Sequence, residues 1–367
     1  MAELALSPQS RGIAPPLSLW GWISLLSKAT GITITVLLHA LKTSVRSPKN
    51  GLTTHQQIAY TGIRIYQSSL PATSIQNLRP STTTTCKRFA KKHYMRHSPI
   101  QLPDGTIACW IGPKDALKVV IVFHGGGYMA AALTEHISIG FAFSDPTRKD
   151  LAVVVLQYRL ASENANHYPI QLQQAVSLLQ HLLHDLKIPS SFITLIGDSA
   201  GGHLLLSLLL HLTHPNPLTA PLKLETNLSS AILISPWVTV STSATSMQLN
   251  SEKDILTISG LEYWGRNFLG GKEMDCWNTP LMAEGQWWGE VPCEEMLVLY
   301  GEDELFRDDI DEFCAKLKQA NHAKTTALKF ANEIHVHMVM NRFLKINKPC
   351  ESEKVFAKWM NEHLGSR

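Results

Sequence analysis

The sequence predicts an α/β domain in which a mostly parallel sheet is covered by helices on both faces. Short, continuous apolar runs typical of buried strands alternate with longer segments whose apolar residues recur at helical spacing. One such run ends in a serine between two glycines, Gly197-Asp198-Ser199-Ala200-Gly201, and an apolar helical pattern follows at once. Ligands of open α/β sheets bind beyond the carboxyl ends of the strands, so we expect functional residues where these runs end.

The expected elements follow one another along the chain, and no internal repeat is visible. The strand-like runs are 107–111, 118–123, 151–156, 192–196, 230–234, 296–300 and 325–330. The clearest helical patterns are 170–186, 202–212, 308–319 and 354–364, with a helical patch at 54–69.

The composition fits one large α/β domain with an appendage. The chain has 367 residues, of which 44% are hydrophobic and 17% charged, so it can bury a sizeable core. The formal net charge is only +3 and no basic block is interleaved with aromatic residues, which gives nucleic-acid binding little support. The six cysteines form no C-x-x-C pair, so the sequence indicates neither a zinc site nor a redox motif.

An apolar segment from Leu17 to Leu41 precedes the strand and helix pattern. It is long enough to span a bilayer, but Lys28 lies near its middle, and a central lysine costs about 2.5–3.5 kcal/mol on insertion. No basic region precedes it and no small-residue cleavage site clearly follows, which disfavours a cleaved signal. A helix packed on the catalytic domain and a membrane anchor or interfacial helix both stay open. The protein is accordingly expected at the endoplasmic reticulum or another membrane, or in the cytoplasm.

The serine between the two glycines has the setting of a nucleophile. A strand that turns sharply into a helix strains the corner residue, and small residues two positions on either side, here Gly197 and Gly201, relieve the crowding. The new helix directs unpaired N–H groups and its positive dipole end toward the corner. Ser199 is therefore the candidate nucleophile, and the Ala200 N–H is a candidate donor to negative charge.

A second motif, His124-Gly125-Gly126-Gly127-Tyr128, follows the 118–123 run directly. Successive glycines let backbone N–H groups converge on an anion because no Cβ intervenes. We expect Gly126 and Gly127 to donate to the oxyanion that forms when a serine attacks an ester carbonyl. His124 and Gly125 are expected to shape the loop rather than to transfer protons.

The general base is expected after the last strand. His335 is the preferred candidate and His337 the runner-up, because both follow the 325–330 run and a loop can present either. A serine hydrolase of this layout carries its triad in the order serine, acid, histidine.

The acid is expected after the 296–300 run. Asp303 lies at the end of that run, where a carboxylate could orient the imidazole and stabilise its charged form. Asp308 and Asp309 suit the first turn of the following helix, whose dipole favours acidic residues. Glu302 and Glu304 are expected to point elsewhere.

With these motifs assembled, the chain from about residue 100 to residue 365 resembles the hormone-sensitive-lipase-like branch of the α/β-hydrolase superfamily. It looks most like the fungal steryl acetyl hydrolases, and its plan is similar to that of the arylacetamide deacetylases. The resemblance rests on His124-Gly125-Gly126-Gly127-Tyr128, Tyr158-Arg159-Leu160-Ala161, 197–202, Asp303 with Leu305, and Ser235-Pro236-Trp237-Val238. It implies the α/β-hydrolase fold, a triad of Ser199, Asp303 and His335, a helical cap, and no cofactor or metal.

The resemblance also suggests how the chain is divided. Residues 1–95 are expected to hold the N-terminal apolar helix and a connecting region, and 96–367 the catalytic domain with a cap inserted at about 239–291. Aromatic residues in that cap are expected to give a dry apolar pocket, and its tryptophans are Trp264, Trp277, Trp287 and Trp288. The sequence departs from many relatives at Ser162, where they have proline, and at Ile334 and Val336 beside the histidine.

These observations predict a serine carboxylic-ester hydrolase that acts through an acyl-enzyme on Ser199. The leading interpretation is a deacetylase or short-acyl esterase whose substrate is a hydrophobic small-molecule ester of a sterol, terpenoid or polyketide-like alcohol. Acyl transfer or condensation on a secondary metabolite at the same site is the alternative. A non-catalytic binding protein on this fold is a third interpretation. The sequence does not indicate the oligomeric state.

Overall fold

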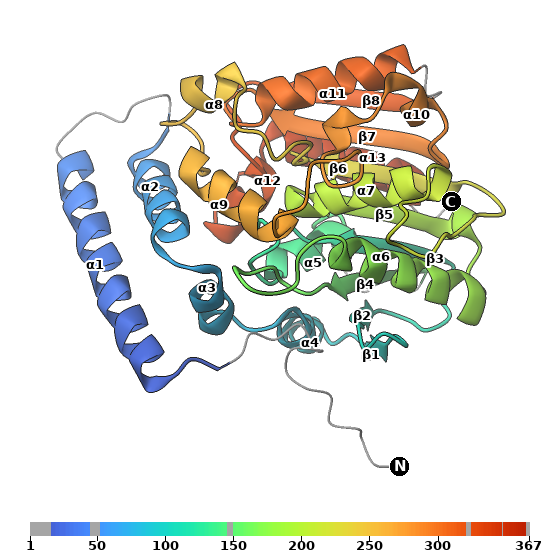
Figure 1. Cartoon of the computed structure of the whole chain (residues 1–367), viewed down its shortest axis with the longest axis horizontal. Coiled ribbons are helices and arrows are strands. Elements are labelled where there is room, and N and C mark those ends of the chain that lie inside the picture. The colour runs from blue at the N-terminus through green and yellow to red at the C-terminus, as the bar shows by residue number, and fades with distance from the viewer. Residues whose placement is uncertain (1–15, 45–51, 145–149, 321–323, 347, 365–367) are drawn as a thin grey trace.

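An eight-stranded sheet forms the centre of the molecule (Figure 1). The computed structural model describes residues 16–44, 52–144, 150–320, 324–346 and 348–364. The strand order is β1-β2-β4-β3-β5-β6-β7-β8, with β1, β2 and β4 paired antiparallel and every other neighbouring pair parallel. The strands are β1 (His97–Gln101), β2 (Ile107–Ile111), β3 (Lys118–Phe123), β4 (Leu151–Gln157), β5 (Ile193–Asp198), β6 (Leu228–Ile234), β7 (Cys293–Gly301) and β8 (Thr325–Phe330).

Helices lie on both faces of the sheet and at one end of it (Figure 1). The N-terminal helices are α1 (Leu19–Ser44), α2 (Thr54–Ser69), α3 (Ala72–Leu78) and α4 (Thr82–Lys92). Those between strands are α5 (Thr134–Gly140), α6 (Ile170–Gln180), α7 (Ala200–Thr213), α8 (Thr245–Leu249), α9 (Ile258–Leu269), α10 (Gly285–Gly289) and α11 (Arg307–Gln319), and α12 (His337–Phe343) and α13 (Glu351–Leu364) follow β8. The predicted α/β fold class, with a mostly parallel sheet, is confirmed.

Several elements differ from the prediction, which named none of the helices α3, α4, α5, α8, α9, α10 and α12. Strand β1 was not expected, because its sequence His-Ser-Pro-Ile-Gln is polar, carries Pro99, and is only partly buried at the edge of the sheet. The helix expected over 170–186 ends its regular part at Gln180, and a wider π-helical turn continues it from His181 to Asp185. None of these differences moves a strand end that carries a candidate site residue.

Local sequence signals explain where the helices near the site begin. Thr53 accepts a hydrogen bond from Gln56 N while the Gln56 side chain accepts from Thr53 N, so a capping box starts α2. Thr257 caps α9 by accepting from Gly260 N. Asp308 and Asp309 lie in the first turn of α11, as predicted, where their charge favours the helix dipole.

Helix α1 lies at the outer edge of the molecule and packs along α2 (Figure 1). Leu25 is buried in this contact, whereas Leu19, Trp20 and Leu26 are exposed, Trp20 by 77%. Among the described residues, α1 is the one helix long and apolar enough over Leu19–Lys42 to cross a membrane, and only 6% of that window is buried. The expected N-terminal region also includes 1–15 and 45–51, which lie outside the described residues.

Candidate active site

The turn from β5 into α7 places Ser199 above the end of the sheet. Ser199 has φ 51° and ψ −120°, a strained backbone conformation for a residue with a Cβ. Gly201 is required in this turn, because a Cβ there would collide with the Phe123 carbonyl at the end of β3. The turn is fixed by Ser199 N, which donates to the Ile234 carbonyl at 3.0 Å. The sharp turn expected from the glycine pattern is therefore present.

Ser199, His335 and Glu304 form one hydrogen-bonded chain. His335 Nε2 lies 2.9 Å from Ser199 Oγ, and His335 Nδ1 lies 3.0 Å from a Glu304 carboxylate oxygen. All three residues are buried, and Glu304 is fully enclosed. This order of hydroxyl, imidazole and carboxylate is the arrangement by which a serine can lose its proton to an oriented base.

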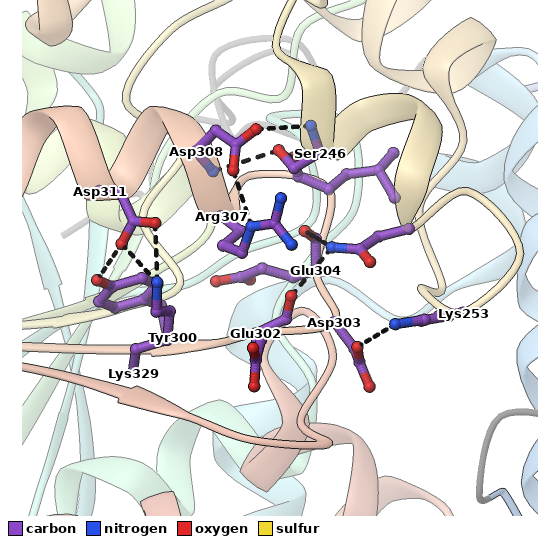
Figure 2. A network of polar contacts seen from close by, with 12 residues as sticks. Ser246, Lys253, Tyr300, Glu302, Asp303, Glu304, Arg307, Asp308, Asp311 and Lys329 are labelled. Carbon is purple, nitrogen blue, oxygen red and sulfur yellow. Dashed lines mark hydrogen bonds and ion pairs between the residues drawn. The ribbon is translucent and has the colours of Figure 1, made fainter.

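The expectation that Asp303 orients the histidine is wrong. Asp303 Oδ1 instead pairs with Lys253 Nζ at 2.6 Å, and Figure 2 shows its side chain directed toward that lysine. The expectation that Glu304 points elsewhere is also wrong, because Glu304 contacts His335. β7 ends at Gly301, and the following turn directs Glu304 inward, where its Oε1 accepts from Gly301 N at 3.1 Å and its Oε2 contacts His335.

The structure brings His335, and not His337, to Ser199. His337 begins α12, and its Nδ1 accepts a hydrogen bond from Ile334 N at 3.3 Å. Val336 between them has φ 45°, so the chain reverses locally and the two rings face different surroundings. Val336 N donates to Ser235 Oγ at 3.0 Å, which holds this turn on the end of β6.

Asp254, which the sequence analysis did not single out, joins the histidine turn to the acid turn. Its Oδ1 accepts from His335 N at 3.1 Å, and its Oδ2 accepts from Leu305 N, beside Glu304, at 2.7 Å. Burial raises the pKa of Asp254. The nearby His335 ring and the N–H groups of Leu305, Ile255 and His335 oppose that rise. Burial likewise raises the pKa of Glu304, and its hydrogen bond with His335 opposes it. Asp254 lies in the expected cap insertion, in no motif of the sequence, so no sequence signal pointed to this role.

Replacing Asp254 with asparagine is expected to lower both stability and turnover. One oxygen becomes an NH2 group that faces a backbone N–H, so a buried donor is left unpaired at a cost of about 1–3 kcal/mol. We expect kcat to fall by about 10-fold or more through misplacement of His335 and Glu304, with KM less affected. Urea unfolding and steady-state kinetics measure both effects. Glu252→Gln, an exposed neighbour, is the matched control, and equal behaviour of the two variants would contradict this role.

The glycine-rich loop after β3 is held next to Ser199. Gly125 N donates to Asp198 Oδ1 at 2.9 Å, and His136 Nε2 lies 3.2 Å from Asp198 Oδ2. Burial acts to raise the pKa of Asp198, but His136 and the Gly125 N–H outweigh it and hold that pKa below its usual value. Gly127 has φ 59°, and its Cα faces the indole ring of Trp264 so closely that no Cβ would fit.

His124 shapes this loop from within the core. Its ring stacks on Tyr158 with centroids 4.3 Å apart, and the Tyr158 hydroxyl donates to the His124 carbonyl at 2.7 Å. His124 is fully buried and has no contact with Ser199, consistent with a loop-shaping role. Gly126, Gly127 and Ser199 all line the same cavity. Ala200 is the first residue of α7, so its N–H is one of the four that no helical carbonyl accepts.

Buried neutral histidines should make the fold sensitive to acid. Burial lowers the pKa of His124 to about 3 and of His203 to about 4, whereas both titrate near 6.5 when unfolded. The unfolded chain therefore binds more protons below about pH 6.5, and each histidine removes roughly 1.4 kcal/mol of stability per pH unit from there toward pH 4. Urea unfolding at about pH 7, 6 and 5 should show this fall. His203→Gln should reduce the slope and the exposed His55→Gln should not; a flat profile would refute the assignment.

A cavity of about 180 Å³ opens above Ser199 and His335. Its wall is mainly apolar and is built from α2, α3, the glycine-rich loop, the segment between β6 and β7, and α12. Of the four cap tryptophans, Trp264 lines it. Trp288 packs instead on Phe313 in the core, and Trp277 and Trp287 lie together, with Trp287 stacked on His214 at 3.9 Å. In the part of the chain that the structure describes, no group of three His, Cys, Asp or Glu residues is arranged to hold a metal ion.

Comparison with known proteins identifies the family. A family model described as steryl acetyl hydrolase matches residues 65–352, more than half of the chain. The chain belongs to the steryl acetyl hydrolase family. It is 23% identical over 296 residues to the steryl acetyl hydrolase-type protein mug81 of Schizosaccharomyces pombe, covering 76% of this chain and 75% of that one. It is 28% identical over 204 residues to steryl acetyl hydrolase 1 of Saccharomyces cerevisiae, covering 51% of this chain but only 45% of the yeast protein.

Solved structures agree with the fold. A bacterial esterase of the hormone-sensitive lipase family superposes with a TM-score of 0.63 at 21% identity, covering 86% of this chain and all of that one. The predicted likeness to the steryl acetyl hydrolases is confirmed, and the fold is shared with this esterase of the hormone-sensitive lipase family. As a steryl acetyl hydrolase family member with esterase relatives, the protein is a carboxylic ester hydrolase.

Proposed function

We propose that the enzyme removes an acetyl or other short acyl group from a hydrophobic alcohol through an acyl-enzyme on Ser199. The chain of contacts from Ser199 Oγ through His335 to Glu304 carries this proposal. His335 Nε2 takes the Ser199 proton as Oγ attacks the acyl carbon, and it then protonates the departing alcohol. Glu304 holds the imidazole tautomer and stabilises the imidazolium. A water activated by the same histidine clears the acyl group.

Backbone donors from two loops complete the proposed mechanism. The N–H groups of Gly126 and Gly127 and that of Ala200 are assigned to the oxyanion, since their loops border Ser199. Each such donor typically contributes about 3–4 kcal/mol to the transition state. Asp198 holds the glycine-rich loop next to Ser199 by accepting a hydrogen bond from Gly125 N. The hydrogen bonds of this loop and of the turn after β5 hold Ser199 in its strained backbone conformation.

The mainly apolar cavity favours an ester with a hydrophobic alcohol, such as an acetylated sterol, terpenoid or polyketide-like molecule. A panel of such acetates, assayed for acetate release with purified enzyme, tests the proposal. Preference for hydrophobic acetates over ethyl acetate supports it, and failure to cleave any acetate rejects it. Product analysis with an added alcohol separates hydrolysis from the alternative acyl transfer or condensation. We keep the proposed division at about residue 95, with a cap at 239–291. Helices α2 and α3 of the N-terminal part line this cavity, as do Ile255, Leu256 and Trp264 of the proposed cap.

We also propose that α1 associates with a membrane. Its exposed apolar side chains, among them Trp20, Leu26 and Leu38, have no described partner surface, and burying such side chains in lipid is favourable. Full-length protein should therefore sediment with membranes and resist carbonate extraction, whereas a chain starting at residue 52 should be soluble. Extraction of both forms alike would support the other interpretation, in which α1 only packs on α2.

A further inference from the structure

The N-terminal helices contribute three polar side chains to a cavity wall that is otherwise mainly apolar. Tyr66 and Gln67 come from α2, and Arg79 is the residue that ends α3. The other polar side chains of the wall are Ser199, His335, Asp198 and His136, which are already engaged with one another or with backbone groups. The three N-terminal groups take no part in these contacts.

Arg79 carries a charge that no described residue neutralises. Its guanidinium makes no hydrogen bond to a described residue and has no described carboxylate within 4.0 Å. Glu135 is the one carboxylate whose charge reaches it, but from beyond ion-pair distance. Burial lowers the pKa of Arg79, and Tyr66 and Glu135 oppose that change. The Arg79 side chain is half-buried in the cavity wall, and its five N–H donors are available to an acceptor on a ligand.

Tyr66 and Gln67 line the same cavity, and each also has a polar atom without a hydrogen-bond partner among the described residues. Tyr66 makes no hydrogen bond through its hydroxyl to a described residue and lines the same cavity as Arg79; burial raises its pKa and the Arg79 charge lowers it. Gln67 Oε1 is buried and has no hydrogen-bond partner among the described residues. The guanidinium and the hydroxyl can donate to an oxygen-rich group of a ligand, and the Gln67 amide can do so when it is turned so that Nε2 faces the cavity.

We infer that the substrate is a hydrophobic ester that also carries a carboxylate, and that Arg79 binds this carboxylate with Tyr66 and Gln67 beside it. The inference rests on the proposed ester hydrolysis at Ser199 and adds the substrate class. Guanidinium and carboxylate match in charge and geometry, and their hydrogen bonds can be bidentate. Asp198 does not compete for Arg79, because its oxygens already accept from Gly125 N and contact His136.

Matched acetates test the inference. The acetate ester of an ω-hydroxy fatty acid and the acetate of the alkanol of equal length differ only in the terminal carboxylate. Wild-type enzyme should cleave the acidic ester with the higher kcat/KM, and Arg79→Gln should lower kcat/KM for that ester by about 10- to 100-fold, mainly through KM. Arg79→Gln should lower kcat/KM for the neutral acetate much less than for the acidic ester, and Arg79→Lys should restore part of the loss for the acidic ester. Arg88→Gln, an exposed arginine on α4, is the control.

A binding measurement keeps the two proposals separable. The free ω-hydroxy acid is titrated into Ser199→Ala protein, with and without Arg79→Gln, by calorimetry. Tighter binding of the acid than of the alkanol, lost with Arg79→Gln, supports the inference even if acetate turnover is absent and the proposed function fails. Cleavage of neutral acetates with no effect of Arg79→Gln on either the acid preference or acid binding overturns the inference and leaves the hydrolase intact.

Discussion

Ser199→Ala is expected to abolish ester hydrolysis while leaving the fold intact. The variant keeps the Cβ and the φ of 51°, so the turn between β5 and α7 is unchanged, but Oγ, the partner of His335 Nε2, is gone. Loss of a serine nucleophile lowers kcat by about 10⁴- to 10⁶-fold. The backbone N–H groups assigned to the oxyanion account for the residual activity. Hydrolysis of p-nitrophenyl acetate measures the loss, and circular dichroism and urea unfolding check the fold.

Ser235, a second serine near the histidine turn, provides a control. Ser235 Oγ accepts from Val336 N on the histidine turn and hydrogen-bonds the Glu304 carboxylate, but in the proposed mechanism it neither attacks the ester nor transfers a proton. Ser235→Ala should therefore retain far more activity than Ser199→Ala. Full turnover by folded Ser199→Ala protein would mean that another group attacks the ester.

Glu304→Gln is expected to lower kcat strongly, whereas Asp303→Asn should change it little. A glutamine amide can donate to His335 Nδ1 and so favour the wrong imidazole tautomer, a change that costs about 10⁴-fold in a comparable triad. Asp303 forms a partly exposed ion pair with Lys253, and such pairs contribute at most about 1 kcal/mol to stability. Steady-state kinetics of the two variants, made at adjacent positions, separate the assignments.

Glu304→Asp adds a test of distance. The shorter side chain keeps the charge but draws the carboxylate back from His335 Nδ1, so activity should lie between that of Glu304→Gln and wild type. If Asp303→Asn proved the more damaging change, the acid would have been assigned to the wrong residue and the turn after β7 would rearrange in solution.

The sequence allowed the sheet and the serine turn to be predicted because their signals are local. The apolar runs of β3 to β7 are buried strands, and the glycines around Ser199 are required by sterics within a few residues. The general base could be narrowed to His335 or His337 from a local signal as well, because both residues follow β8 directly. The left-handed φ of Val336, together with the contacts of this turn with Asp254 and Ser235, determines which of them faces Ser199.

The acid could not be chosen from the sequence, because three acidic residues in succession follow Gly301. Which of them points inward depends on contacts with distant segments: Lys253 attracts Asp303, and Asp303 N donates to the Glu333 carbonyl. Asp254 was missed for a similar reason, since its partners are backbone N–H groups 51 and 81 residues away. The cap tryptophans differ in role because packing, not composition, decides which one reaches the cavity.

Peptide mapping after reaction with a fluorophosphonate probe tests the central claim most directly. The probe reacts with a serine that an adjacent base has activated, so the adduct should lie on Ser199. Labelling should disappear in Ser199→Ala and slow markedly in Glu304→Gln, while Asp303→Asn should label at the wild-type rate. An adduct on another residue, or none on folded wild-type protein, would contradict the assignment of Ser199 as a nucleophile activated by His335 and Glu304.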